Sequence, residues 1–397
     1  MILSEMIRNI KTIVCGVSGG VDSAVAALLL KRKGYSVIGL FMKNWDVTDE
    51  RGVCTTDQDR EDAKFVCDHL RIPFYEVNFV KEYWNQVFSS FVKDYQAGLT
   101  PNPDVLCNKY IKFHAFFQYA RNRFDANAIA TGHYARTDVG EDLDKIDPKK
   151  GVKLLTAYDK MKDQTLFLSQ IPQHALQMTI FPIGEFTKDV VKKIAASAGM
   201  EKIAKKKESM GICFIGSREY HKFIEEYVEP KPGRFIHLET GEVVGTHKGI
   251  HYWTLGQRAQ IGGKSGALFV ADKNTETQDI TVVYGTDHPA LFSQTMFTEP
   301  AQWINQPPQE LLQNQKCDMD FRFQHIQKLI KCTVTLSGSN CLTVSLQYPL
   351  RAITGGQYAV FYKGDECLGS AKILRPGPSL YMMNQRERVR EPDIYYF

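Results

Sequence analysis

The chain has 397 residues, of which 43% are hydrophobic and 24% are charged, with a formal net charge of +4. This composition is typical of a folded globular protein and excludes a mainly disordered chain. The longest apolar runs are far shorter than the ~20 residues that a membrane-spanning helix needs, so we expect no membrane segment. A chain of this length is expected to form two or three domains.

The first part of the chain, up to about residue 135, alternates short β-branched runs with helical patterns. Such alternation predicts an α/β domain, in which helices connect the strands of a parallel sheet. The expected strands are 13–17, 35–42, 74–79 and 128–131, and the expected helices are 22–33, 59–70, 81–96 and 108–123.

The character of the sequence changes further along the chain. Charged residues dominate 138–151, where we expect a surface loop. Helical patterns resume at 163–170 and 188–198, and after residue 216 turn signals become frequent between short strand-like segments. We therefore expect an N-terminal α/β domain (1–216), a small, mainly β central domain (217–285) and a C-terminal β-barrel (286–397).

The loop Ser18-Gly19-Gly20-Val21-Asp22-Ser23 lies between the first strand and the first helix. Its glycines let backbone N–H groups approach an anion, its serines add hydroxyl donors, and a helix N-terminus attracts negative charge. The carboxyl end of a strand in an open α/β sheet is also where ligands bind. The pattern therefore predicts a phosphate site, and a glycine turn without a ligand is the less favoured alternative.

This loop lacks the Gly-Lys-Ser/Thr ending of a Walker A motif, which argues against a kinase or GTPase. It resembles the PP-loop of the ATP pyrophosphatase superfamily, whose members form an adenylate and release pyrophosphate. The superfamily includes GMP synthetase, argininosuccinate synthetase, NAD synthetase and tRNA thiolases. The loop therefore implies ATP but leaves the second substrate open.

Nine cysteines are scattered along the chain without a C-x-x-C pair, which indicates a reducing compartment and catalytic or redox roles. Cys107 follows the proline-rich turn at 100–103, and Asp104 is a natural N-terminal residue for a helix there. A helix start and the neighbouring Lys109 both favour a thiolate. Cys213 follows the basic run 205–207 between two glycines. Either cysteine alone would more often be a structural residue.

Together with the PP-loop, the two cysteine segments closely resemble the tRNA-specific 2-thiouridylases, which replace the C2 oxygen of the wobble uridine with sulfur. The resemblance extends over almost the whole chain, and 287–291 and 363–370 look most like mitochondrial members from animals. The segments that carry the resemblance are 39–45, 102–109, 130–134, 162–164, 211–216, 252–258 and 359–362.

The resemblance implies a role for each matching residue. Cys213 would carry the persulfide sulfur, Cys107 would attack it and leave a Cys107–Cys213 disulfide, and Asp104 would act as an acid or base beside the target uracil. The implied ATP-binding residues are Gly16, Val17, Ser18, Gly19, Gly20, Val21, Asp22, Ser23, Met42 and Gly132. The implied tRNA-binding residues are Asn102, Pro103, Asp104, His133, Lys162, Asp163, Gln164, Arg322, Phe323 and Gln357. Bacterial members have tyrosine where this chain has Phe323, which removes one hydroxyl.

The same resemblance implies ATP and Mg²⁺ as cofactors, without a protein ligand assigned to the metal. The partners would be the anticodon stem-loop of tRNA, of the Lys, Glu and Gln type, and a persulfide donor such as a cysteine desulfurase or a relay protein. We also expect a mitochondrial location, with the cytoplasm as the alternative, and a monomeric protein. The basic run 205–207 and the C-terminal barrel are candidates for phosphate contacts.

Three alternatives remain at this point. A PP-loop synthetase or amidotransferase acting on a small molecule would not need paired cysteines. A tRNA thiolase that uses an iron–sulfur cluster would need a third cysteine near Cys107 and Cys213, and the spacing nominates none. A non-catalytic RNA-binding protein would not need Asp104 and both cysteines.

Overall fold

The computed structural model describes residues 11–45, 55–147, 149–207, 220–263, 266–390 and 392–396. The chain divides into two compact units, each of which is described by itself. Unit 1 comprises residues 1–88, 103–218 and 365–368, and unit 2 comprises residues 89–102, 219–364 and 369–397.

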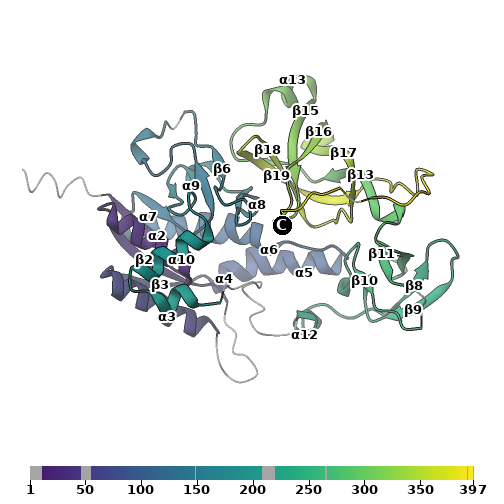
Figure 1. Ribbon diagram of the computed structural model, residues 1–397, viewed down its shortest axis with the longest axis horizontal. Coiled ribbons are helices and arrows are strands. Elements are labelled where there is room, and N and C mark those ends of the chain that lie inside the picture. Colours follow the sequence, from purple (N-terminus) through teal and green to yellow (C-terminus); the bar gives the residue numbers. More distant parts are fainter. Residues whose placement is uncertain are drawn as a thin grey trace, which may run out of the picture. The chain divides into compact units, whose positions relative to one another are not determined.

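Unit 1 contains a five-stranded sheet of order β3-β2-β1-β4-β7, in which every neighbouring pair is parallel (Figure 1). The predicted parallel α/β sheet is thus confirmed. The chain winds outward from β1 through β2 and β3, and then returns to place β4 on the other side of β1. Ligands bind at such a switch point. The strands are β1 (Thr12–Gly16), β2 (Ser36–Lys43), β3 (Phe74–Asn78), β4 (Ala128–Ala130) and β7 (Thr179–Ile180).

Helix α2 (Val21–Arg32) follows β1 and is apolar on nearly all sides, as expected of a buried helix. It packs against β1, α3 (Thr55–Leu70), α10 (Lys188–Ser197) and α11 (Glu201–Lys205). Ala24, Val25 and Leu30 are fully buried in this core. Because α2 is held on several sides, its N-terminal end is fixed at the carboxyl end of β1.

The two helices expected at 81–96 and 108–123 are each interrupted by a π-helical stretch. The first is divided into α4 (Val80–Tyr83), η1 (Trp84–Phe88) and α5 (Ser89–Gln96). The second is divided into α6 (Pro103–Leu106), η2 (Cys107–Ala115) and α7 (Phe116–Phe124). A π-helical turn shifts the side-chain phase and occurs frequently at functional sites. Cys107 lies at the start of such a stretch.

The rest of unit 1 lies around a small antiparallel pairing. β5 (Ala135–Thr137) pairs with β6 (Leu154–Thr156), and the first residues of β19 (Glu366–Pro376) pair with β6. The expected loop between β5 and β6 contains the short helix η3 (Leu143–Lys145). Two short helices follow, α8 (Thr165–Leu168) and α9 (Gln173–Leu176).

Unit 2 contains, after residues 89–102, a five-stranded sheet of order β10-β11-β12-β8-β9, and we call its residues 220–284 the middle barrel. Its core contains Phe235, Leu268, Val270 and Ile280. Its elements are α12 (Tyr220–Glu225), β8 (Gly233–His237), β9 (Val243–His247), η4 (Ile250–Tyr252), β10 (Arg258–Ala259), β11 (Leu268–Lys273) and β12 (Ile280–Tyr284).

The second half of unit 2 is an antiparallel sheet of order β13-β17-β16-β15-β18-β19, and a β13–β19 pairing closes it into a barrel. The predicted C-terminal β-barrel is thus confirmed. Its elements are η5 (Pro289–Leu291), β13 (Phe292–Thr298), β14 (Gln302–Trp303), α13 (Gln309–Asn314), β15 (Lys316–Arg322), β16 (Ile330–Ser337), η6 (Gly338–Asn340), β17 (Cys341–Arg351), β18 (Tyr358–Lys363) and β19.

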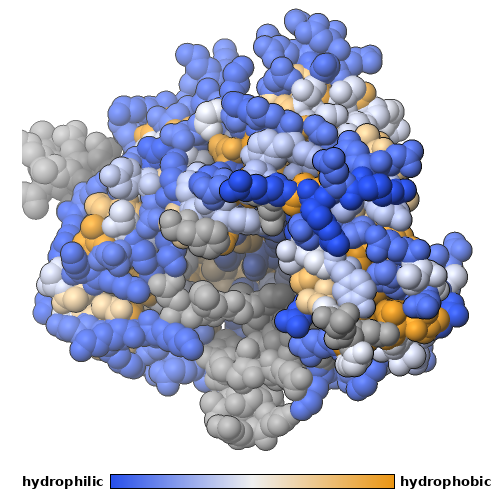
Figure 2. All heavy atoms as spheres, turned by 45° about the vertical axis from the view of Figure 1, so that its right-hand side comes forward, coloured by the Kyte–Doolittle hydropathy of each residue, from blue (hydrophilic) through white to orange (hydrophobic). Residues whose placement is uncertain are grey.

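Hydrophilic side chains cover most of the described surface on the face drawn in Figure 2. Within the described ranges, no helix has both the length and the apolar character required to cross a membrane.

Candidate active site

The predicted phosphate loop connects β1 to α2 and is closed by its two serines. Ser23 Oγ accepts a hydrogen bond from the Ser18 backbone N–H (3.1 Å) and donates to the Gly20 carbonyl (3.1 Å). The two hydroxyl oxygens lie 3.2 Å apart. Gly19 has a positive φ of +73°, and a Cβ there would lie 2.4 Å from the Asp59 carbonyl oxygen. Glycine is therefore required at position 19 by both conformation and space.

Gly132, which follows β4, packs directly on this loop. A Cβ at position 132 would lie 2.6 Å from the Asp22 carbonyl carbon and 2.6 Å from the Ser23 nitrogen. On the other side, a Cβ on Gly16 would lie 3.3 Å from Met42 Cε. The structure thus brings Gly16, Met42 and Gly132 together around the loop at the carboxyl end of the central strand.

Asp22 of the loop forms an ion pair that the sequence analysis did not identify. Lys188 Nζ, at the start of α10, lies 2.8 Å from each oxygen of the Asp22 carboxylate. Tyr134 Oη also donates to Asp22 Oδ1, at 2.9 Å. The side chain of Lys188 is 10% exposed and that of Asp22 is 32% exposed. In the sequence, Lys188 is recognisable only as a residue at the start of a predicted helix. That position gives no indication of an ion pair with Asp22, which is 166 residues away.

Lys206 forms a second ion-pair network at the same loop. Its Nζ donates to Asp59 (2.8 Å), to Asp62 (2.6 Å) and to the Gly19 carbonyl oxygen (3.2 Å). Asp62 also pairs with Lys202, and these lysines hold the pKa of the Asp62 carboxyl below its usual value against the opposing effect of burial. Lys206, the middle lysine of the basic run 205–207, therefore links the loop to α3. Lys205 and Lys207 are exposed.

A second group of polar side chains in unit 1 is linked to Asp104 through the charge of Lys112. Burial raises the pKa of the Asp104 carboxyl, and the charge of Lys112 opposes that increase. Lys112 Nζ lies 3.3 Å from Nε2 of His133, and His133 Nδ1 lies 2.8 Å from Thr131 Oγ1. Burial, together with the Lys112 charge, holds the pKa of His133 well below its usual value. The neutral ring therefore accepts from Lys112 at Nε2 and donates to Thr131 from Nδ1.

Cys107 is 3% exposed and lies in η2, one turn after Asp104. The next two side chains contact α8 and the segment that follows it. Asn108 Nδ2 donates to the Phe167 carbonyl oxygen (3.1 Å), and Lys109 Nζ donates to Gln170 Oε1 (3.2 Å). Burial lowers the pKa of the Lys109 ammonium. Cys213, the other predicted cysteine, lies outside the described residues.

The predicted tRNA contacts at 162–164 differ in exposure. Asp163 is 1% exposed, and its two oxygens accept hydrogen bonds from the Ala157 N–H (2.8 Å) and the Thr165 hydroxyl (2.7 Å). Gln164 Oε1 accepts from the Tyr134 N–H (2.9 Å), next to His133. Asp163 therefore holds this turn in place, and Lys162 and Gln164 are its more exposed members.

In unit 2, Asn102 lies beside Gln357, with Asn102 Nδ2 3.4 Å from Gln357 Oε1. Arg322 and Phe323 are each 3% exposed. Arg322 Nε donates to Tyr362 Oη (3.0 Å), and the Phe323 N–H donates to Gln327 Oε1 (3.0 Å). The pair at 322–323 is thus packed inside its own barrel, whereas Asn102 and Gln357 are partly exposed.

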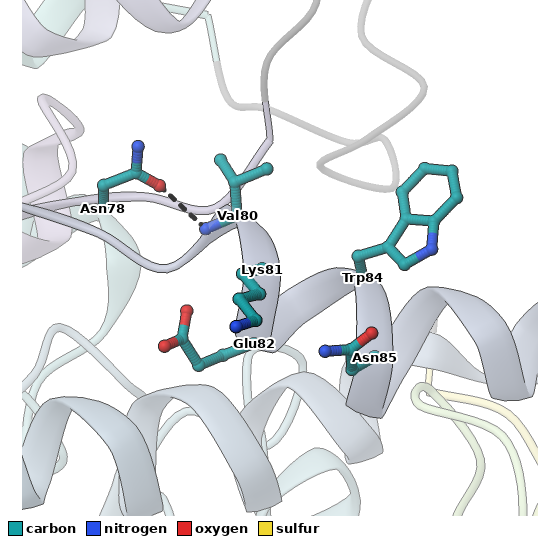
Figure 3. Close-up of a pocket in the computed structure, with 6 residues that line it drawn as sticks. All are labelled: Asn78, Val80, Lys81, Glu82, Trp84 and Asn85. Atoms are coloured by element: carbon teal, nitrogen blue, oxygen red, sulfur yellow. Dashed lines mark hydrogen bonds between the residues drawn. The ribbon is translucent and has the colours of Figure 1, made fainter.

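Unit 1 also contains a pocket of ≈ 560 Å³ that includes none of the predicted site residues (Figure 3). It lies where β3 leads into α4 and η1, and Asn78 Oδ1 accepts from the Val80 N–H there (3.0 Å). Trp84 of this pocket stacks on Trp45 with ring centroids 5.4 Å apart. Among the residues that the structure describes, no group of three or more His, Cys, Asp or Glu side chains is arranged to hold a metal ion.

Comparison with known proteins decides the family. The tRNA methyl transferase HUP domain model matches residues 11–217, the PRC-barrel domain model of the same group matches 221–284, and the aminomethyltransferase beta-barrel domain model matches 293–373. The mitochondrial tRNA-specific 2-thiouridylase 1 of Gallus gallus is 50% identical over 97% of each chain. That of Homo sapiens is 50% identical, covering 96% of this chain and 94% of the relative. The chain belongs to the tRNA-specific 2-thiouridylase family.

A bacterial member of this family, the tRNA-specific 2-thiouridylase MnmA of Alkaliphilus oremlandii, is 45% identical over 91% of this chain and 96% of its own length. The predicted family membership is thus confirmed. The roles of individual residues in this chain are predictions, and to the predicted residues the geometry adds Lys188, Tyr134 and Lys206, which contact the loop.

We predict that Gly132→Ala destabilises the loop, because the added methyl group meets backbone atoms of Asp22 and Ser23 that cannot move independently. The expected cost is about 1–3 kcal/mol of unfolding free energy, together with weaker ATP binding. Thermal unfolding with and without ATP measures both effects. Gly262→Ala is the matched control, since no atom lies within 4 Å of its Cβ position. An alanine at 132 with unchanged stability and ATP affinity would contradict the assigned packing.

We also predict a pH signature for Asp104. A carboxyl whose pKa is raised in the folded state favours folding when protonated, and this contribution is lost as the pH rises through the folded-state pKa. Asp104→Asn should therefore raise the melting temperature near pH 7, and the gain should disappear at acidic pH, where the wild-type carboxyl is also protonated. Asp68→Asn, at an exposed position of α3, is the control. A gain that is independent of pH would count against this explanation.

Proposed function

We propose that the chain catalyses ATP-dependent replacement of the C2 oxygen of a wobble uridine in tRNA by sulfur. The observation that carries this proposal is that one unit holds both the phosphate loop at the switch point of its sheet and the Asp104–Cys107 segment at a helix start. The relatives that match over almost their full length are named tRNA-specific 2-thiouridylases. Their names agree with the tRNA sulfurtransferase that the sequence predicts.

The first step is adenylation of the uracil. The C2 oxygen attacks the α-phosphorus of ATP, the bond to the β,γ-pyrophosphate breaks, and the uracil oxygen becomes part of an AMP ester that can leave. The loop amides of 19–23 and the N-terminus of α2 would bind the departing pyrophosphate, as helix N-termini do for anions. Loss of the N3 proton makes the oxygen a better nucleophile. Asp104 is suited to accept this proton, because a carboxylate whose pKa is raised is a more effective base near neutral pH.

Lys188 and Asp22 supply the charges at the phosphate loop. Lys188 is held against Asp22 before any nucleotide arrives, so that its ammonium is already oriented beside the loop. We propose that it neutralises charge on the phosphates during adenylation. Asp22, whose carboxylate is partly exposed at the loop, fits the oxygen ligand that Mg²⁺ prefers. Mg²⁺ bound there with ATP would offset the negative charge of the leaving pyrophosphate.

The second step transfers sulfur. A persulfide on Cys213 attacks C2, the C2–S bond forms, and AMP leaves with the original oxygen. The sulfur is then linked to C2 and to Cys213 Sγ. The Cys107 thiolate attacks Cys213 Sγ and releases the thiolated uridine, and a Cys107–Cys213 disulfide remains. Two electrons from a cellular thiol reductant restore both cysteines, which suits a reducing compartment.

The cellular setting follows from the same relatives. Those from vertebrates are named mitochondrial, and we assign this chain to the mitochondrion. We propose that it acts as a monomer on the anticodon stem-loops of tRNAs for Lys, Glu and Gln. Its persulfide would come from a cysteine desulfurase or a relay protein. Bases in an anticodon loop are already unpaired, so little energy is needed to bring the uridine to the site.

The decisive test is incubation with ATP, a persulfide source and anticodon stem-loop RNA, followed by a mercury-gel shift that detects thiolated RNA. We predict that Cys107→Ser and Cys213→Ser each abolish the shifted product, whereas ATP and RNA binding persist. Cys341→Ser, a partly exposed cysteine of unit 2, serves as the matched control and should retain activity. Thiolated RNA from the Cys213→Ser protein would refute the assignment.

We further predict that Lys188→Met lowers the rate of pyrophosphate release by about 10²-fold, the scale seen when one charge-stabilising donor is lost from a transition state. Lys193→Met, at an exposed position of the same helix, should leave the rate within twofold. Pyrophosphate release in a single turnover measures the effect. An unchanged rate in the Lys188→Met protein would remove this lysine from the adenylation step.

A further inference from the structure

The middle barrel has no part in the chemistry described so far, yet it contacts the segment that precedes Asp104. Residues 99–102 belong to unit 2 and lead straight into Pro103 and Asp104 of unit 1. Thr100 is four positions before Asp104 in the sequence and seven before Cys107. Whatever holds Thr100 therefore limits where the catalytic segment can lie.

Thr100 is held through both its backbone and its side chain. Its N–H donates to the Gly355 carbonyl oxygen (2.9 Å), and its own carbonyl oxygen accepts from Gln357 Nε2 (2.8 Å). A Cβ on Gly356, whose φ is +93°, would lie within 2.8–3.0 Å of three Thr100 backbone atoms. The C-terminal barrel thus fixes the backbone of this residue, and the Thr100 hydroxyl points elsewhere.

That hydroxyl meets the middle barrel. Thr100 Oγ1 lies 3.1 Å from Thr254 Oγ1, so that one hydroxyl donates to the other. The preceding turn makes a second contact, because a Cβ on Gly98 would lie 3.0 Å from side-chain atoms of both Ile250 and Thr275.

Thr254 is presented by a turn, residues 254–257, that is tied to both barrels. The Thr254 N–H donates to Gln257 Oε1 (2.9 Å), and the Gly256 N–H donates to the Val270 carbonyl oxygen of β11 (2.8 Å). From the C-terminal barrel, Arg351 Nη2 donates to the Gly256 carbonyl oxygen (2.6 Å). The turn is therefore a rigid support, and the Thr254 hydroxyl is its contact with Thr100.

We propose that Thr254 of the middle barrel is a positioning residue for the reaction: through the hydroxyl of Thr100 it fixes the segment that leads to Asp104 and Cys107. This proposal rests on the proposed function, because it assumes that Asp104 and Cys107 act on the uridine. It gives the middle barrel a mechanical role in catalysis. A segment clamped on both sides keeps the base and the thiol in a productive geometry, and a small displacement from that geometry slows a reaction considerably.

Thr254→Val tests the proposal, since valine keeps the shape and removes the hydroxyl. A net hydrogen bond of about 0.5–1.5 kcal/mol corresponds to a roughly two- to twelvefold change in rate. We expect kcat for thiolation to fall by that factor, with KM for ATP and stem-loop RNA within twofold of wild type. Thr254→Ser, which keeps the hydroxyl, should restore kcat. Thr246→Val, at an exposed position of β9, is the control for a general effect on the middle barrel.

A double-mutant cycle separates this contact from general loss of stability. Thr100→Val should slow thiolation as much as Thr254→Val does, and the double variant should be no slower than either single variant. Wild-type kcat in Thr254→Val, a loss confined to KM, or additive losses in the double variant would overturn the proposal. Cys107→Ser and Asp104→Asn are measured in parallel. If those two variants still thiolate RNA, the proposed function fails, whatever Thr254→Val does.

Discussion

The close approach of Gly132 to the backbone of Asp22 and Ser23 is the constraint on which the site depends. This approach brings the end of β4 against the start of α2, at the point where the strand order of the sheet reverses. Because residue 132 is a glycine, no side chain separates β4 from α2 there. The loop amides, where we propose that phosphate binds, are thereby held beside the end of β4, and α2 packs on both the loop and the sheet core.

Charge balance completes the arrangement around the loop. Two lysines from the later part of unit 1, Lys188 and Lys206, reach back to carboxylates at or beside it. Lys188 is paired with Asp22, and Lys206 with Asp59 and Asp62, so the positive charges beside the glycine loop are balanced by carboxylates. For Lys188 we propose a further role, the neutralisation of charge on the phosphates of ATP. An oriented cation that needs no rearrangement stabilises developing charge better than one that must be recruited from solvent.

The sequence predicted those parts of the molecule that depend on local pattern. The strands of the sheet, the loop at 18–23 and the barrel class follow from β-branched runs, glycines and turn signals. The π-helical stretches at 84–88 and 107–115 do not, because apolar spacing cannot distinguish a π-helical turn from an α-helix. Lys188 and Thr254 were missed for another reason. Their partners, Asp22 and Thr100, lie 166 and 154 residues away, and only the folded chain brings them together.

In the proposed reaction, a second thiol, that of Cys107, completes the transfer of sulfur to the uridine. The experiment that decides this is peptide mass spectrometry, without reductant, after a single turnover with persulfide-loaded protein, ATP and stem-loop RNA. We expect one disulfide-linked peptide pair containing Cys107 and Cys213 for each thiolated uridine formed. Stoichiometric thiolated RNA from protein in which both cysteines remain free thiols would contradict it.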